Sequence, residues 1–199
     1  MSDIFGADAT TPILVLIDIQ REYVTKGRPF NLDGIEPSLE NCRSILEHAR
    51  EAAWPVAHVR HLGATHLFNE ATEWSRFVEG FEPLANEMIF AKRKLSCFSN
   101  DDFARMMETA RANPVYIVGY NAQMCCLSTV VDAHHRGMRL KFVRDASWAR
   151  ATQRGSEAEV YPWIVDTIGI YADLVDAAAV LGDARGVTRR RRLSSAAAE

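Results

Sequence analysis

The sequence has little of what marks the specialised protein classes. Its 199 residues include 11 glycines, 7 prolines and 4 cysteines, which excludes a collagen-like, low-complexity or disulfide-dense chain. No apolar run approaches the roughly 20 residues that a membrane span needs. The formal net charge is only −3, so no global charge points to nucleic acid or to an acidic membrane surface. We therefore expect a globular protein with no nucleic-acid and no membrane partner.

The cysteines also have no metal-binding spacing. They stand at Cys42, Cys97, Cys125 and Cys126 and form no CxxC pair. The first twelve residues contain acidic side chains and no apolar block, unlike a secretory signal. We expect a cytoplasmic protein with reduced cysteines, in which a thiol nucleophile is available.

What is present is an alternation of short apolar runs with longer stretches of helical periodicity. The predicted strands are Ile13–Ile17, Val56–Arg60, Glu87–Ala91, Val115–Val118, Arg139–Arg144 and Tyr171–Val175. The predicted helices cover residues 36–52, 101–112, 124–136 and 156–168. Such β-α-β alternation predicts an α/β fold, a three-layer α/β/α sandwich with a mainly parallel six-stranded sheet.

We predict one domain in residues 1–182 and a disordered tail in residues 183–199. The tail contains Arg189–Arg192, for which contact with RNA or anionic lipid competes with a solvated state, and the solvated state is favoured. Residues 61–86 form a long loop-like insertion rich in aromatic side chains, and insertions of this kind often carry function.

Three residues of chemical interest occupy equivalent places in this pattern. Asp18 ends the first strand, Lys92 ends the third, and Cys125 begins the helix after the fourth. Ligands of parallel sheets bind outside the carboxyl ends of the strands, so these side chains could meet in one crevice. A helix N-terminus and a nearby ammonium lower the pKa of a cysteine, and a carboxylate can shuttle its proton. On spacing alone, an aspartate that caps a helix and a buried, inert cysteine remain open alternatives.

Four segments make the pattern recognisable. They are LVLIDIQREYV (14–24), AKRKLSCF (91–98), VGYNAQMCCLSTVVDAHHRG (118–137) and VRDAS (143–147). In this order they resemble the isochorismatase-like cysteine hydrolase superfamily, over about residues 12–181. The family's Asp-x-Gln pattern matches Asp18 and Gln20, its lysine matches Lys92, and its nucleophile matches Cys125, six residues after Gly119.

The resemblance implies a function and a set of roles. Cys125 would attack the carbonyl of a small amide, ureido or carbamoyl compound and form a thioester, with Asp18 as general acid and base and Lys92 as electrostatic support. A cis peptide bond between Tyr120 and Asn121 is implied, with the backbone amides of Asn121 and Cys125 as the oxyanion hole. Candidate substrate-binding residues are Gln20, Tyr23, Phe98, Trp74 and Trp148.

Three alternatives stay open at this point. True isochorismatases are similar but lack the cysteine and protonate a vinyl ether. Nicotinamidases carry a metal set of one aspartate and two histidines, and here Arg60 stands where that aspartate is expected, although His61 and His66 remain. A binding protein that kept the fold, or a redox sensor built on Cys125 and Cys126, is the third. We favour amide-type hydrolysis with no metal and no cofactor, in a homo-oligomer such as a dimer or tetramer.

Overall fold

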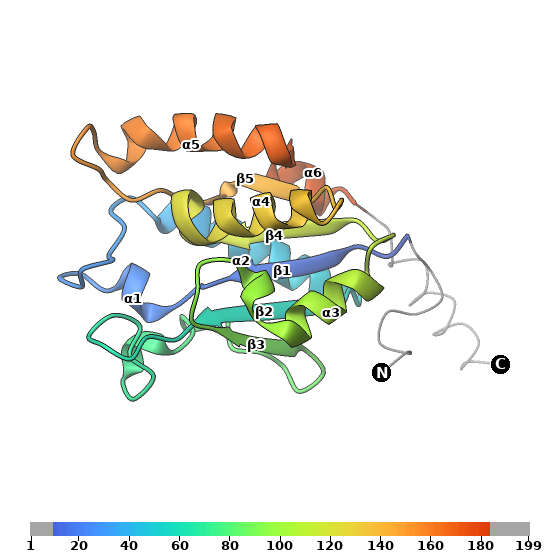
Figure 1. Cartoon of the computed structure of the whole chain (residues 1–199), viewed down its shortest axis with the longest axis horizontal. Helices are drawn as coiled ribbons and strands as arrows, with labels where there is room; N and C mark the ends of the chain where they lie inside the picture. Colours follow the sequence, from blue (N-terminus) through green and yellow to red (C-terminus); the bar gives the residue numbers. More distant parts are fainter. Residues whose placement is uncertain (1–9, 184–199) are drawn as a thin grey trace.

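The computed structural model describes residues 10–183, which form three layers around a central sheet (Figure 1). Six parallel strands stand in the order β3-β2-β1-β4-β5-β6. They are β1 (Ile13–Ile17), β2 (Val56–His61), β3 (Met88–Lys92), β4 (Val115–Gly119), β5 (Lys141–Ser147) and β6 (Asp173–Val175). The predicted α/β/α sandwich is confirmed. The expected disordered tail, with Arg189–Arg192, lies outside the described residues except for Asp183.

Helices cover both faces of the sheet. The longer helices are α2 (Glu36–Glu51), α3 (Asp101–Thr109), α4 (Leu127–His135) and α5 (Glu157–Tyr171), and the short ones are α1 (Arg21–Val24) and α6 (Ala177–Leu181). In Figure 1, α3 and α4 lie in front of the sheet and α2 behind it. β1 shows why both faces are covered, because Ile13 and Val15 pack into one buried cluster and Leu14 and Leu16 into the other. None of these helices is long and apolar enough to cross a membrane, within residues 10–183.

The predicted strands and longer helices form within a few residues of their expected bounds. One difference matters for function: the helix expected from residue 124 begins as a π-helical turn, Ala122–Cys126, before α4. The helices α1 and α6 were missed. With four and five residues they are too short for a helical repeat of apolar side chains to show.

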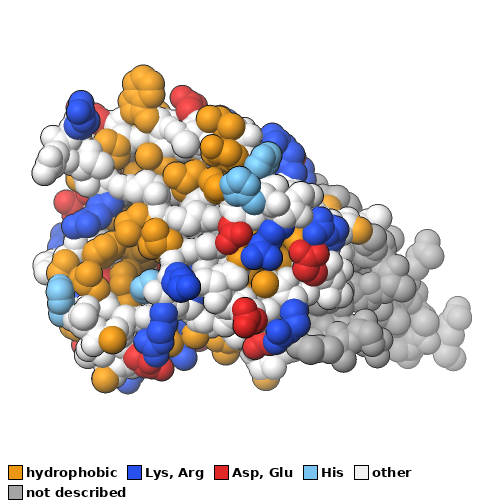
Figure 2. Space-filling view, viewed as in Figure 1, with side chains coloured by type: hydrophobic (Ala, Val, Ile, Leu, Met, Phe, Trp, Pro, Cys, Tyr) orange, Lys and Arg blue, Asp and Glu red, His pale blue; other side chains and the backbone are white. Residues whose placement is uncertain are grey.

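The sheet order places a topological switch point between β1 and β4. From β1 the sheet grows through β2 and β3 on one side and through β4, β5 and β6 on the other. The chain therefore leaves β1 and β4 in opposite directions, and such a switch point is where open α/β sheets bind ligands. Apolar side chains gather at this end of the molecule, with Lys and Arg side chains around them (left in Figure 2). Asp18 follows β1, and Cys125 follows β4.

Candidate active site

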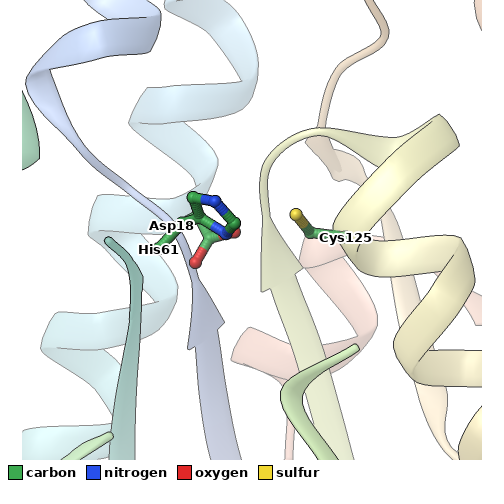
Figure 3. Close-up of side chains that lie close together, drawn as sticks. All are labelled: Asp18, His61 and Cys125. Carbon is green, nitrogen blue, oxygen red and sulfur yellow. The ribbon is translucent and has the colours of Figure 1, made fainter. Parts of the chain in front are cut away.

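The three residues predicted to be catalytic meet at this switch point. The Lys92 ammonium lies 2.6 Å from Asp18 Oδ2 and 3.2 Å from Cys125 Sγ, and it donates a hydrogen bond to each. All three are buried, with exposures of 0%, 2% and 4% for Asp18, Lys92 and Cys125. In Figure 3, Cys125 approaches from one side, and its sulfur points across the gap toward Asp18.

Local structure explains how each side chain is placed. Asp18 has a left-handed backbone conformation with φ of 51°, which aspartate tolerates better than most residues, and this turn carries the chain away from β1. Lys92 is the last residue of β3. Cys125 lies in the π-helical turn, and its carbonyl accepts a hydrogen bond of 2.7 Å from the Thr129 hydroxyl. The same hydroxyl accepts a hydrogen bond of 3.0 Å from the Cys97 backbone N–H, which ties the turn to the segment after β3.

A fourth residue, His61, belongs to the site. It is the last residue of β2 and the register partner of Lys92 in β3, and its Nδ1 lies 3.4 Å from Lys92 Nζ. From the sequence, His61 was considered only as a remaining histidine of the nicotinamidase-type metal set. His61 stands at the end of a strand, as Asp18 and Lys92 do, and this pattern in the sequence could have predicted its place in the site.

Three potential metal ligands lie close together here. Single ligand atoms of Asp18, His61 and Cys125 are within 4.8 Å of one another, a spacing that suits a zinc ion (Figure 3). However, the Lys92 ammonium is within 3.4 Å of all three groups. The ammonium therefore holds the position that a metal cation would take among these ligands. His66 is exposed and is not part of this cluster.

The electrostatics of the nucleophile differ from the sequence-based expectation. Burial raises the pKa of the Cys125 thiol, the Asp18 carboxylate raises it further, and Lys92 only partly offsets both. The expected lowering by the ammonium is present, but burial and Asp18 outweigh it, so the net pKa of this thiol is raised and not lowered. Burial opposes the charge of Lys92, yet Asp18 and Cys125 together raise the pKa of this ammonium. The unliganded site thus holds a protonated thiol beside a buried ion pair.

Asp18 has capacity left to accept a proton. Its Oδ2 accepts from Lys92, whereas Oδ1 is buried without a hydrogen-bond partner in the described part of the chain. A buried carboxylate oxygen without a partner is costly, and such atoms in native structures often mark a functional site. The Cys125 thiol, whose pKa the Asp18 carboxylate raises, is a chemically suitable proton donor to this oxygen.

The loop before the nucleophile has the conformation that the resemblance implies. The peptide bond between Tyr120 and Asn121 is cis. The Asn121 side chain accepts a hydrogen bond of 3.0 Å from the Met124 backbone N–H and so caps the π-helical turn that carries Cys125. The backbone of Asn121 lowers the pKa of the Tyr23 hydroxyl, whereas Asp18 and Cys125 raise it, so this loop and the catalytic candidates act on the same phenol.

Gln20, expected to contact substrate, is bound to the protein instead. It has no exposed surface. Its Oε1 accepts from the His61 backbone N–H at 2.8 Å, and its Nε2 donates to the His61 carbonyl at 2.9 Å and to the Ser75 carbonyl at 2.8 Å. Three of the four hydrogen bonds that a glutamine amide can make are thus internal. In the structure Gln20 is a support for His61 and for the insertion.

Tyr23 is close to the catalytic groups. Burial raises the pKa of its hydroxyl well above the usual value, the neighbouring Cys125 and Asp18 raise it further, and the backbone of Asn121 opposes them. Tyr23 is therefore a neutral phenol. Its ring packs edge-on against Phe68 of the insertion, with ring centroids 5.1 Å apart. The insertion thus contributes an aromatic wall beside the site.

The other three predicted substrate contacts lie in different surroundings. Phe98 is buried in the core against Phe103, with ring centroids 5.3 Å apart. The Arg28 guanidinium stacks on Trp74 at 4.8 Å from the ring centre. Trp148 lines a separate cavity of about 450 Å³ between α2 and α5, and none of the catalytic candidates lines this cavity. Trp74 and Trp148 thus lie against other groups, whereas Phe98 belongs to the same buried cluster as Cys125.

Residues 12–160 match the sequence model of the isochorismatase domain, which covers most of the chain. The chain belongs to the isochorismatase family. The family's members are hydrolases, and several of them are amidohydrolases.

Two relatives and one solved structure show how far the similarity extends. The chain is 30% identical to the uncharacterised isochorismatase family protein YddQ of Bacillus subtilis over 139 residues, 68% of this chain and 77% of YddQ. It is 25% identical to maleamate amidohydrolase of Pseudomonas putida over 150 residues, 67% of this chain and 70% of that enzyme. The crystal structure of an isochorismatase from Pseudomonas putida KT2440 superposes with a TM-score of 0.77 at 27% identity, covering 87% of this chain and 91% of that one.

Proposed function

We propose that this family member is a cysteine hydrolase that cleaves a C–N bond in a small amide, ureido or carbamoyl compound. The observation that carries the proposal is the single ammonium of Lys92 bound to both Asp18 and Cys125. A thiol, a carboxylate and a fixed positive charge are the nucleophile, the proton carrier and the electrostatic support of an acyl transfer. The similarity to maleamate amidohydrolase supports the same class of bond.

The first half-reaction begins from a protonated thiol. Cys125 Sγ attacks the carbonyl carbon while its proton passes to Asp18, whose Oδ1 is without a partner in residues 10–183. The tetrahedral oxyanion would accept hydrogen bonds from the backbone amides of Asn121 and Cys125. The C–N bond then breaks, Asp18 returns the proton to the departing nitrogen, and ammonia or an amine leaves a thioester on Cys125.

The second half-reaction reverses these roles. Asp18, again a carboxylate, removes a proton from water, and the resulting oxygen nucleophile attacks the thioester carbon. The C–S bond breaks, and the proton on Asp18 returns to the Cys125 sulfur. The products are a carboxylic or carbamic acid and the amine, and the enzyme regains its starting protonation. Lys92 stays charged throughout, because Asp18 and Cys125 raise the pKa of its ammonium.

Paired variants of two adjacent cysteines test the proposal. Ammonia or amine release is measured across a panel of small amides, ureas and carbamoyl compounds for wild type, Cys125→Ala and Cys126→Ala. Cys126 is the matched control because it is also buried and its thiol donates to the Gly119 carbonyl at 3.5 Å instead of accepting from Lys92. We expect Cys125→Ala to abolish release and Cys126→Ala to keep most of it. Equal losses in both variants would contradict the assignment.

The alternative reactions have their own signatures in the same assay. Release of pyruvate from isochorismate would favour the vinyl-ether chemistry of true isochorismatases. No release from any compound, together with a peroxide-dependent change in partner binding, would favour the redox sensor. The retained thiol at position 125, directed at a buried ammonium, supports amide-type hydrolysis over the first of these.

A cytoplasmic location and a homo-oligomer remain part of the proposal. The four cysteines are buried and free, as a reducing compartment favours. Two large apolar side chains on α5, Trp163 and Ile170, are 73% and 65% exposed, and subunit association would cover such surface. Sedimentation of the purified protein would measure the oligomeric state.

A further inference from the structure

The Lys92 ammonium has a third hydrogen-bond partner outside the Asp-Lys-Cys set. An ammonium carries three N–H donors. Here two of them reach Asp18 Oδ2 at 2.6 Å and Cys125 Sγ at 3.2 Å, and the third reaches His61 Nδ1 at 3.4 Å. We propose that His61 is a positioning residue, whose Nδ1 accepts this third N–H and keeps the ammonium directed at the nucleophile. The proposal rests on the hydrolase function above and adds a member to its machinery.

The hydrogen bond determines which form of the imidazole is present. An ammonium can only donate, so Nδ1 must be unprotonated and the ring proton must lie on Nε2.

The charged groups around His61 favour its neutral form. Burial lowers the pKa of His61 and the Lys92 ammonium lowers it further, with a smaller contribution of the same sign from Arg93. The Asp18 carboxylate and the Lys94 backbone oppose them, and the net direction is downward. His61 is therefore a neutral acceptor at pH 7. Protonation would remove the acceptor and place a second positive charge against Lys92.

Contacts of the His61 backbone and of its ring fix the position of the imidazole. The Gln20 side chain is hydrogen-bonded to both the N–H and the carbonyl of His61, at 2.8 and 2.9 Å. The ring itself packs edge-on against Phe68, with centroids 5.3 Å apart. On the other side, β3 pairs His61 with Lys92 in register. A side chain fixed in this way can fix the direction of the ammonium that it binds.

Two variants separate a positioning role from a structural one. His61→Leu removes the acceptor, whereas in His61→Asn the amide oxygen can take the place of Nδ1. Alkylation of Cys125 by iodoacetamide is followed across pH in the Cys126→Ala background, together with thermal unfolding. We expect alkylation in His61→Leu to be about 2- to 10-fold slower at a given pH, the range that one hydrogen bond covers, with the profile moved to higher pH. His61→Asn should return most of the wild-type profile.

Two outcomes of this experiment would overturn the proposal. One is an unchanged profile in His61→Leu, and the other is an equal loss in both variants. If His61→Leu does not fold, the decision passes to nitrogen NMR of the wild-type protein with labelled histidine. The expected signal at pH 7 is a His61 ring protonated on Nε2 only, with a pKa below the usual 6.5. A ring protonated on Nδ1 would refute the inference.

Turnover provides the remaining readout. With any substrate found in the panel, His61→Leu should lower kcat with little change in KM, because His61 contacts Lys92 and not the substrate. A rise in KM at constant kcat would overturn the positioning role. If wild type hydrolyses nothing while the alkylation and NMR results are as expected, the proposed hydrolase function fails and the role of His61 stands.

Discussion

Asp18 and Lys92 form an ion pair of 2.6 Å in which neither side chain has exposed surface. Breaking a buried pair by removing one partner typically costs about 3–5 kcal/mol, because the other charge is left uncompensated. Each variant of this pair therefore changes both stability and chemistry. Thermal unfolding has to accompany every activity measurement at these two positions.

The first prediction concerns the proton carrier. Asp18→Asn keeps the shape of the side chain, and asparagine also tolerates the left-handed conformation at φ of 51°. We expect turnover to fall by about 10²- to 10⁴-fold, the usual contribution of a general acid-base group. Alkylation of Cys125 should shift to lower pH, since the Asp18 charge raises the pKa of that thiol. Faster alkylation together with lost turnover would assign the proton transfer to Asp18. An unchanged alkylation profile would contradict the influence of Asp18 on the thiol.

The second prediction separates two roles for Gln20. Gln20→Met has a similar volume but loses the three hydrogen bonds to His61 and Ser75. Each buried backbone group left without a partner costs about 1–3 kcal/mol, so we expect a clear loss of thermal stability and a lower kcat. A substrate-contact role predicts the opposite pattern, with stability unchanged and KM raised. Unfolding and steady-state kinetics together decide between the two.

The third prediction concerns acid stability and a buried carboxylate away from the site. Burial favours the neutral form of Glu87, but hydrogen bonds from Arg50 at 2.7 and 2.9 Å and from the Leu84 backbone at 2.8 Å lower its pKa to about 2. His58 Nε2 lies 2.8 Å from the same carboxylate. Because the folded-state pKa lies below the usual 4.5, the stabilisation is present above pH 4.5 and is lost as the pH falls toward 2.

Glu87→Gln tests this linkage. We expect the variant to be less stable than wild type at pH 7 and to lose less stability between pH 4.5 and 2, since the titrating group is gone. Denaturant unfolding at a series of pH values measures both effects. If the free energy of unfolding fell equally with pH in the two proteins over this range, Glu87 would not be the cause of the acid sensitivity.

The fourth prediction concerns the contact between β1 and β4 under the site. Gly119 has φ of +112°, and a Cβ there would lie 2.1 Å from the Ile17 carbonyl oxygen. We expect Gly119→Ala to unfold or to lose several kcal/mol of stability, because the obstacle is backbone and cannot move aside. Gly27 is the matched control: its φ is +82°, and a Cβ would meet nothing within 4 Å. Gly27→Ala should cost only the conformational penalty of about 1–2 kcal/mol. Similar losses in the two variants would rule out the steric explanation.

The sequence determined the order of the elements and the positions of three functional groups. Continuous apolar runs such as Ile13–Ile17 are typical of strands buried on both faces of a parallel sheet, and in such a sheet the carboxyl ends of all strands lie on the same side. Asp18, Lys92 and Cys125 follow strand ends, so their meeting could be expected from spacing and resemblance alone.

The tertiary structure decided what each group touches. His61 accepts from Lys92 because β2 and β3 pair in a register that sets the two residues side by side, and no local pattern encodes that register. Gln20 is bonded to the backbone of His61 for the same reason, since its partner is 41 residues away in the chain. The raised pKa of the Cys125 thiol likewise follows from burial beside Asp18. Residue types and spacing indicate which groups are present, but distances of a few ångströms between strands determine their hydrogen bonds and their protonation.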